Sequence, residues 1–297
     1  MIFQLPSYKV YLSLERGLSK HTVKAYINDI SKLFSYLSNS ENTEISYDNI
    51  TDKHLIQFLA AINELGIEAS SQARMVSGIK SYFQFLVLSN YLEEDPTILL
   101  ESPRLKRKLP ETLSLHEIDK IMEIIDLSTP EGIRNKAMIE LLYGCGLRVT
   151  ELCELKISNV YTDVEFIKII GKGNKERLVP IGTSALKHLT IYLNERRKIV
   201  AANGFSDFVF LNRFKKSLSR ISVFNFVKEL ALKAGIQKNI SPHTFRHSFA
   251  THLIEGGADL YAVQEMLGHS SITTTEIYTH LDRDYLKSVV LQYHPRS

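Results

Sequence analysis

Hydrophobic positions in the first hundred residues recur every three to four residues, the spacing of one face of an α-helix. Ser19 and Thr51 are residue types that cap helix starts, and an amphipathic stretch follows each of them. A third stretch of this kind covers about residues 71–89, and a shorter one precedes Gly17. The pattern predicts a small bundle of four helices.

The helical pattern is interrupted between Asp95 and Pro110, a stretch that holds three prolines and a run of basic residues. Prolines end helices and favour extended chain. We therefore expect a helical domain at residues 1–95, a linker at residues 96–110 and a second domain at residues 111–297.

The second domain begins with helical patterns and then changes period. Ser114 opens a capping-box pattern, and further helices are expected over about residues 133–143 and from Val149. Residues 165–170 and 176–181 are typical of two strands joined by a turn rich in glycine and lysine, which predicts a β-hairpin. The rest of the chain is mostly helical in pattern. The expected fold class is mainly α with a small β-hairpin or sheet: a helical bundle followed by a mixed α+β domain.

The composition is close to that of an ordinary soluble globular protein, with 44% hydrophobic and 23% charged residues. No apolar run approaches the roughly 20 residues of a membrane helix, and residues 1–17 lack the features of a signal peptide. These observations predict a cytoplasmic protein with no membrane partner. The two cysteines, Cys145 and Cys153, do not make a disulfide framework, and we expect them to be buried free thiols.

The net charge is only +3, but the basic residues are clustered along the chain. Clustered cations on a nearly neutral protein can form a local surface that binds phosphate groups. The alternative is that each cluster is an ordinary solvated surface. The candidate DNA-binding residues are Arg104, Lys106, Arg107, Lys108, Lys175, Arg177, Arg213, Lys215, Lys216 and Arg220.

Several familiar kinds of active site are absent from the sequence. His243 and His247 are four residues apart, but the zinc-protease pattern needs a glutamate directly after the first histidine, and that residue is Thr244. No glycine-rich loop of the Walker type occurs, and no serine lies in a nucleophile elbow. The sequence therefore predicts no metal site and no cofactor.

The chemistry of the remaining candidates suits attack on a phosphodiester. Arg148 and Arg246 present fixed forks of donors to non-bridging oxygens, where negative charge grows in the transition state. Tyr278 can act as the nucleophile when a cationic site or a base such as His243 helps to ionise its hydroxyl. The leaving 5′-oxygen needs a proton, which Lys172 near the tip of the hairpin is placed to supply.

These residues, in this order, resemble those of the tyrosine recombinase (phage integrase) family. The matching set is Arg148, Lys172, His243, Arg246, His247, His269 and Tyr278. The surrounding motifs, such as Gly-Leu-Arg-x-x-Glu-Leu and Leu-Gly-His-Ser-Ser, are similar to those of the Xer branch, and the likeness extends over essentially the whole chain. It implies a SAM-like N-terminal domain that binds DNA and a C-terminal catalytic domain, which together clamp the duplex.

The resemblance also implies a role for each matching residue. Arg148 and Arg246 would clamp the scissile phosphate. Lys172 would protonate the 5′-oxygen as the general acid. His243 would assist proton transfer, and His269 would donate a hydrogen bond to the phosphate.

The nucleophile implied by the resemblance is Tyr278, which would form a 3′-phosphotyrosyl bond. Tyr285, seven residues later, is the alternative, but the spacing from His269 matches the family at Tyr278. Glu151 and His247 would support the residues that contact the phosphate.

By this resemblance the protein is expected to be a site-specific tyrosine recombinase, which cuts and rejoins duplex DNA without metal or ATP. Four protomers would act together on DNA, either alone or with a related recombinase, and a division-linked DNA translocase is a further candidate partner. The two-domain size favours the resolution of chromosome dimers at cell division. The alternatives are a phage or transposon integrase and a type IB topoisomerase. The segment after Leu281 is expected to dock either on a neighbouring protomer or on its own chain.

Overall fold

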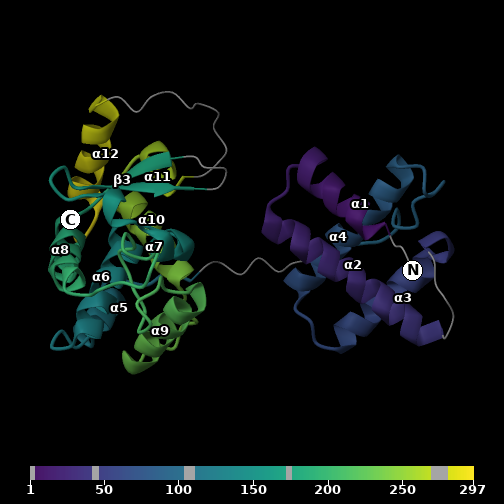
Figure 1. The fold of residues 1–297 in the computed structure, drawn as a ribbon, viewed down its shortest axis with the longest axis horizontal. Coiled ribbons are helices and arrows are strands. Elements are labelled where there is room, and N and C mark those ends of the chain that lie inside the picture. Colours follow the sequence, from purple (N-terminus) through teal and green to yellow (C-terminus); the bar gives the residue numbers. More distant parts are fainter. Residues whose placement is uncertain (1–3, 42–46, 104–110, 172–175, 269–279) are drawn as a thin grey trace. The chain divides into compact units, whose positions relative to one another are not determined.

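The computed structural model describes residues 4–41, 47–103, 111–171, 176–268 and 280–297. The chain divides into two compact units, Met1–Lys108 and Leu109–Ser297 (Figure 1). Each unit has its own hydrophobic core. The expected fold class, mainly α with one small sheet, is confirmed. Of the helices in the described ranges, none has the length and apolar character needed to cross a bilayer.

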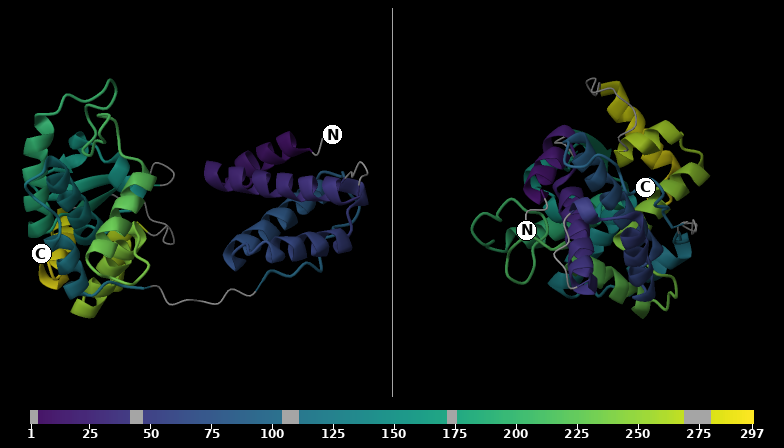
Figure 2. Two further views of the ribbon diagram at one scale, coloured as in Figure 1. Left: turned by 90° about the horizontal axis from the view of Figure 1, so that it is seen from below. Right: turned by 90° about the vertical axis from the view of Figure 1, so that its right-hand side faces the viewer.

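The N-terminal unit is the predicted helical bundle (Figure 2). Its elements are α1 (Leu5–Val10), a π-helical continuation (Tyr11–Glu15), α2 (Lys20–Glu41), a 3₁₀ turn (Tyr47–Asn49), α3 (Asp52–Glu64) and α4 (Ala69–Leu88). Ser19 accepts a hydrogen bond from the N–H of Thr22 at the start of α2, and Thr51 is the N-cap residue of α3. Inside the bundle Tyr8 meets Tyr82 edge to face, with ring centroids 5.1 Å apart.

The chain leaves this unit slightly later than the sequence predicted. Asp95 accepts hydrogen bonds from the backbone N–H and the hydroxyl of Thr97, at 2.8 and 2.7 Å, which turns the chain back on the bundle. Leu100 is consequently buried in the core of the N-terminal unit. The predicted linker at residues 96–110 therefore starts too early, and its second half, residues 104–110, lies outside the described residues.

The C-terminal unit contains a three-stranded antiparallel sheet in the order β1–β2–β3. Its elements are α5 (Leu115–Glu123), α6 (Pro130–Gly144), α7 (Val149–Glu154), a 3₁₀ turn (Ile157–Asn159), β1 (Val160–Tyr161), β2 (Phe166–Ile170), β3 (Glu176–Pro180), α8 (Thr183–Arg197), α9 (Arg220–Lys233), α10 (Pro242–Gly256), α11 (Leu260–Leu267) and α12 (His280–Tyr293). Ser114 and Glu117 form the predicted capping box at the start of α5. Strands β2 and β3 are the two predicted strands, and their register pairs Ile169 with Arg177.

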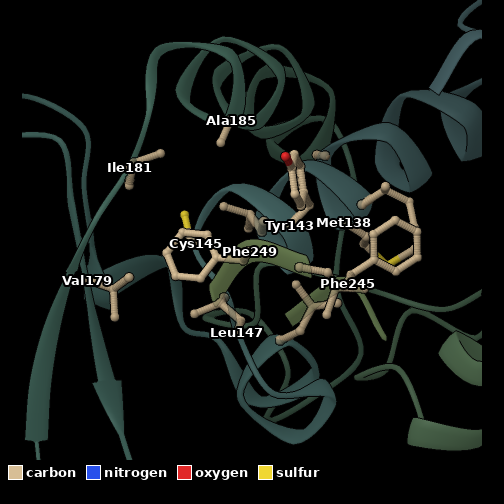
Figure 3. Packing of buried hydrophobic residues seen from close by; sticks show 14 of the residues in the cluster. Met138, Tyr143, Cys145, Leu147, Val179, Ile181, Ala185, Phe245 and Phe249 are labelled. Atoms are coloured by element: carbon tan, nitrogen blue, oxygen red, sulfur yellow. The ribbon is translucent and has the colours of Figure 1, made fainter. Parts of the chain in front are cut away.

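Helix α6 is the centre of the core in this unit. Every residue from Ala137 to Tyr143 is buried, so the helix needs neighbours on all sides. Phe245 and Phe249 of α10 supply one of these sides (Figure 3). The two thiols, Cys145 and Cys153, are free and buried as expected, and burial raises the pKa of both.

Helix α12 packs on its own unit. Leu286, Val289 and Val290 are buried in the core of that unit, whereas Tyr285 and Leu291 remain about half exposed. The described part of this segment therefore packs within its own chain, and docking on a neighbouring protomer stays a prediction.

The residues after α12 are fixed by polar contacts inside the unit. Arg296 donates a hydrogen bond to Glu140 at 2.7 Å, and Glu140 is fully buried. His294 is 3% exposed, and its ring centroid lies 4.7 Å from that of Tyr143. Burial, followed by the charges of His252 and Arg296, lowers the pKa of His294 to about 3. His294 is therefore neutral in the folded protein near pH 7.

We expect acid to destabilise the fold through His294. An unfolded histidine has a pKa near 6.5, so between pH 6.5 and about 3 the unfolded chain binds more protons than the folded chain. The stability contributed by neutral His294 is present above pH 6.5 and falls by about 2 kcal/mol by pH 5. Urea unfolding at pH 7 and pH 5 measures this loss, which should be smaller in His294→Phe.

A matched control is His116→Phe, because His116 is exposed. His116→Phe should lose as much unfolding free energy between pH 7 and pH 5 as the parent chain does. An unchanged pH dependence in His294→Phe would contradict the expectation.

Candidate active site

A glycine turn positions Arg148 between α6 and α7. Gly146 has a left-handed backbone with φ of 58°, and a Cβ there would lie 2.5 Å from Phe249, so only glycine fits. Arg148 follows as the N-cap residue of α7. Glu151, in the first turn of α7, accepts a hydrogen bond from the backbone N–H of Arg148 at 2.7 Å. The Gly-Leu-Arg-x-x-Glu motif is thus a helix start that joins an arginine to a carboxylate.

Glu151 is a buried carboxylate shared by three arginines. Arg177 binds both of its oxygens at 2.8 Å, and Arg148 Nη1 donates to Oε1 at 2.9 Å. Arg246 Nη1 lies 3.7 Å from Oε2. Burial by itself would raise the pKa of Glu151, but the hydrogen bonds and charge of Arg177, followed by the hydrogen bonds of Arg148, lower it below its ordinary value. The carboxylate is therefore ionised, and we call these four residues the arginine cluster.

Arg246 reaches the cluster from α10. It is buried, and its Nη1 donates to the carbonyl of Gly146 at 2.6 Å. Burial, followed by the charge of Arg148, lowers the pKa of Arg246 to about 10, and Glu151 acts in the opposite direction. Arg246 therefore stays protonated near pH 7.

Three successive main-chain carbonyls at the C-terminal end of α11 each accept a hydrogen bond from a different arginine of the cluster. The pairs are Arg177 Nε with Met266 at 2.8 Å, Arg246 Nη2 with Leu267 at 2.5 Å, and Arg148 Nη2 with Gly268 at 3.2 Å. The last carbonyls of a helix lack partners within the helix and form the negative end of its dipole, so they attract cations. The end of α11 thus holds all three guanidinium groups.

The cluster carries an excess of positive charge. Three guanidinium groups and one carboxylate leave a net charge of +2. The side chain of Arg148 is 42% exposed, whereas those of Glu151, Arg177 and Arg246 are 7% exposed or less. Arg148 is therefore the member best placed to meet a ligand from solution. Fixed donors of this kind stabilise negative charge as it develops, which suits a phosphate at its transition state.

The two predicted histidines of α10 lie on its first turns. His243 is exposed and comes three residues before Arg246, so the two lie on the same side of the helix. His247 is half-buried. Among the described residues, no group of three or more histidine, cysteine and acidic side chains is arranged to hold a metal ion.

Three predicted catalytic residues, Lys172, His269 and Tyr278, lie outside the described residues. The same is true of five DNA-binding candidates, namely Arg104, Lys106, Arg107, Lys108 and Lys175. Described residues lie close in the sequence to these three predicted catalytic residues. His269 directly follows Gly268, whose carbonyl accepts from Arg148, and Lys172 belongs to the hairpin whose second strand carries Arg177.

The prediction that Arg177 contacts DNA is wrong. Its side chain is 6% exposed, and its three nitrogens donate to Glu151 and to the carbonyl of Met266. Arg177 and Val179 are two residues apart and both lie on the buried side of β3. Because side chains alternate along a strand, this spacing was the signal in the sequence that Arg177 points inward.

Four other DNA-binding candidates lie on the surface of the C-terminal unit. They are Arg213, Lys215, Lys216 and Arg220, and all are exposed. The first three belong to a tight turn in which the side chain of Asn212 accepts hydrogen bonds from the backbone N–H groups of Phe214 and Lys216, at 2.8 and 3.1 Å. The turn fixes the backbone from which these side chains extend.

The chain belongs to the phage integrase family, whose model matches residues 111–284, and the model of the phage integrase N-terminal SAM-like domain matches residues 5–90. Within this family it is similar to the proteins called tyrosine recombinase XerD. It is 41% identical to those of Staphylococcus epidermidis and Staphylococcus aureus over 294 residues, which cover 99% of this chain and 99% of each relative. The resemblance to the Xer branch, and to XerD-like proteins in particular, is confirmed.

Solved structures of DNA complexes have the same fold. The XerH site-specific recombinase bound to a palindromic difH substrate, in a post-cleavage complex, has a TM-score of 0.72 and 27% identity over 92% of this chain and 80% of that one. The Tn1549 transposon integrase in complex with circular intermediate DNA has a TM-score of 0.72 at 18% identity, over 95% of this chain and 98% of that one. The present chain is thus a site-specific tyrosine recombinase, an enzyme that binds duplex DNA and transfers its strands.

Substitution of Gly268 should impair DNA cleavage more than it impairs folding. Gly268 has a φ of 65°, and a Cβ there would lie 3.0 Å from Arg177 Cδ, so an alanine would displace the end of α11 or the arginine. We expect Gly268→Ala to slow strand cleavage at least about tenfold, because small misplacements of catalytic groups are costly. The rate of formation of the covalent protein–DNA complex measures the effect.

Gly235→Ala is the matched control. Gly235 also has a left-handed backbone after a helix, with φ of 69°, but a Cβ there would meet nothing within 4 Å. Both variants should lose about 1 kcal/mol of stability through backbone strain. Equal cleavage rates in the two variants would show that the contact with Arg177 has no effect on the reaction.

Proposed function

We propose that this recombinase joins Tyr278 to the 3′ end of a cleaved DNA strand at the arginine cluster. The observation that supports this proposal is the convergence of the three arginines on Glu151 and on the end of α11. That helix end directly precedes, in the sequence, the segment that contains His269 and Tyr278. A phosphate bound by Arg148 would therefore lie next to the part of the chain that supplies the nucleophile.

In the proposed reaction the hydroxyl oxygen of Tyr278 attacks phosphorus, and the bond between phosphorus and the 5′-oxygen breaks. His243 receives the tyrosine proton, and Lys172 gives a proton to the 5′-oxygen. One phosphodiester is exchanged for one phosphotyrosyl bond, so the energy of the bond is kept for rejoining. The reaction therefore requires neither ATP nor a metal ion.

The negative charge that develops on the non-bridging oxygens is stabilised by fixed cations. Arg148 and Arg246 hold these oxygens, and His269 donates a further hydrogen bond to them. Glu151 lies among the arginines and offsets the repulsion between their charges. His247, half-buried one position after Arg246, supports the same turn of α10.

The biological role that we propose is the resolution of chromosome dimers at cell division, in the cytoplasm. The full-length similarity to proteins called XerD supports this role over that of a phage or transposon integrase. The two units would clamp one duplex, and four protomers would assemble on two duplexes. A related recombinase and a division-linked DNA translocase are the partners that this role predicts. Recombination between two identical sites on one plasmid would fit it, whereas a requirement for two different sites would favour an integrase.

The turn that carries Arg213, Lys215 and Lys216 is proposed as a contact to the DNA backbone. Its cations are exposed, and the side chain of Asn212 fixes the turn. Exposed cations that bind phosphate release counterions from DNA, so this turn suits a surface that binds the DNA backbone.

The nucleophile can be tested by trapping the covalent intermediate. The probe is a duplex that this protein selects from a random-sequence pool. A set of such duplexes each carries a single nick at a different central position. Cleavage next to the nick releases a short fragment that diffuses away, so the covalent intermediate cannot be rejoined. In EDTA, the parent chain should form a protein–DNA complex that resists SDS, and Tyr278→Phe should form none, because the phenol oxygen is absent.

Tyr285→Phe is the control, since Tyr285 is exposed and is the alternative nucleophile. It should form the complex at the parental rate. A complex that persists in Tyr278→Phe and disappears in Tyr285→Phe would move the nucleophile to Tyr285. A need for added metal in the parent chain would contradict the proposed mechanism.

Removal of one cation from the proposed contact turn should weaken DNA binding in a salt-dependent way. We expect Lys216→Ala to reduce the slope of log affinity against log salt concentration by about one unit, because one fewer counterion is released. Gel-shift titrations at several salt concentrations measure the slope. Lys233→Ala, which removes an exposed lysine paired with Glu229 at 2.7 Å, should leave it unchanged. Equal slopes for the parent chain and Lys216→Ala would remove this turn from the interface.

A further inference from the structure

Arg177 is the one member of the arginine cluster that comes from the sheet. It lies on β3 opposite Ile169 of β2, one residue pair away from the end of the strands between which Lys172 lies in the sequence. Its side chain points into the unit and is 6% exposed. A DNA phosphate would therefore meet Arg148 and not Arg177, and any effect of Arg177 on the reaction must pass through its neighbours.

Those neighbours belong to two other parts of the site. Nη1 and Nη2 of Arg177 donate to the two oxygens of Glu151 on α7, and Nε donates to the carbonyl of Met266 at the end of α11. Gly268 packs against the same side chain, since a Cβ there would lie 3.0 to 3.3 Å from three Arg177 atoms. One guanidinium group thus ties the hairpin strand to the helix start that carries Arg148 and to the helix end that precedes His269.

The contact with Glu151 also has an electrostatic consequence. Glu151 is buried and ionised, and it lies beside the place where a phosphate would bind to Arg148. A buried carboxylate without a full partner would repel that phosphate and would draw Arg148 toward itself. Arg177 occupies both carboxylate oxygens, so Arg148 donates to the Glu151 side chain through Nη1 alone. The side chain of Arg148 remains 42% exposed.

We propose that Arg177 is a positioning residue for strand transfer: it neutralises Glu151 and fixes the end of α11, so that Arg148 is available to the scissile phosphate. This proposal rests on the proposed function of the arginine cluster. Two other roles lead to different expectations. A purely structural ion pair would affect folding and leave the reaction unchanged, and a direct DNA contact would require exposure that the side chain lacks.

The test compares Arg177→Met, Glu151→Gln and the double variant, all as full-length protein with the nicked selected duplex. The measured quantity is the rate constant of covalent complex formation at saturating protein, together with DNA affinity by gel shift. Arg177→Met should lower the rate constant about 100-fold while affinity changes by less than about threefold, because the ground-state contacts to DNA are kept. The double variant should be at least about tenfold faster than Arg177→Met, since the repelling charge is gone.

The pH dependence gives a readout that a structural role would not produce. In the parent chain Arg177 lowers the pKa of Glu151, so its removal raises that pKa. Protonation of Glu151 as the pH falls should then begin at a higher pH in Arg177→Met than in the parent chain, and it should restore part of the activity of that variant. The same fall in pH should give no such gain in the double variant. Arg177→Lys should have a rate constant between those of the parent chain and Arg177→Met, because its ammonium group still offsets the charge of Glu151 but cannot bind both carboxylate oxygens and the Met266 carbonyl together.

Arg196→Met is the matched control for loss of a buried arginine. Arg196 is 4% exposed and donates to the carbonyls of Phe208 and Ser206, away from the cluster. It should lower the melting temperature and leave the rate constant of folded protein unchanged. The proposal is overturned if Arg177→Met reacts at the parental rate, or if Glu151→Gln fails to improve it. Absence of a covalent complex in the parent chain would instead count against the proposed function.

Discussion

The structure of the site depends on how one helix ends. The final carbonyls of α11 have no partners within the helix, and three arginines from α7, α10 and β3 supply the missing hydrogen bonds. Guanidinium groups brought this close would repel one another, and the buried carboxylate of Glu151 offsets that repulsion. The helix end and the carboxylate together allow positive charge to be concentrated before any DNA arrives. In the proposed reaction, this charge would already be in place when the phosphate reaches its transition state, which is the condition for efficient electrostatic catalysis.

Much of the fold follows from local patterns that the sequence displays directly. The helices after Ser19, Thr51 and Ser114 begin where their capping residues predict, because a cap is a contact between near neighbours in the chain. The hairpin strands could also be predicted, because they pair residues that are close to one another in the chain. The end of the N-terminal unit was misplaced because Leu100 is buried through a turn at Asp95, a detail that composition does not reveal. The packing of α12 on its own unit likewise depends on long-range contacts.

The arginine cluster could be predicted only in part. Arg148, Glu151 and Arg246 were chosen from their motifs, and the structure brings them together. Arg177 was predicted to contact DNA as part of an exposed basic cluster, because a charged residue near a turn is usually exposed. Its inward direction depends on the register of β3 and on the presence of a buried carboxylate 26 positions earlier in the chain. The partner of a buried charge lies far away in sequence, and for that reason a reading of local segments missed it.

The acceptors at the end of α11 are main-chain atoms, and this has a consequence for how the family can vary. A carbonyl is present whatever side chain the residue carries, so exchange of Met266 or Leu267 for other apolar residues keeps the hydrogen bonds to Arg177 and Arg246. Gly268 is the exception, because its backbone is left-handed and the Arg177 side chain lies against it. Drift in sequence at this helix end is therefore compatible with an unchanged site, whereas each arginine must remain an arginine. Divergent members of such a lineage can keep one chemistry while the residues that frame it change.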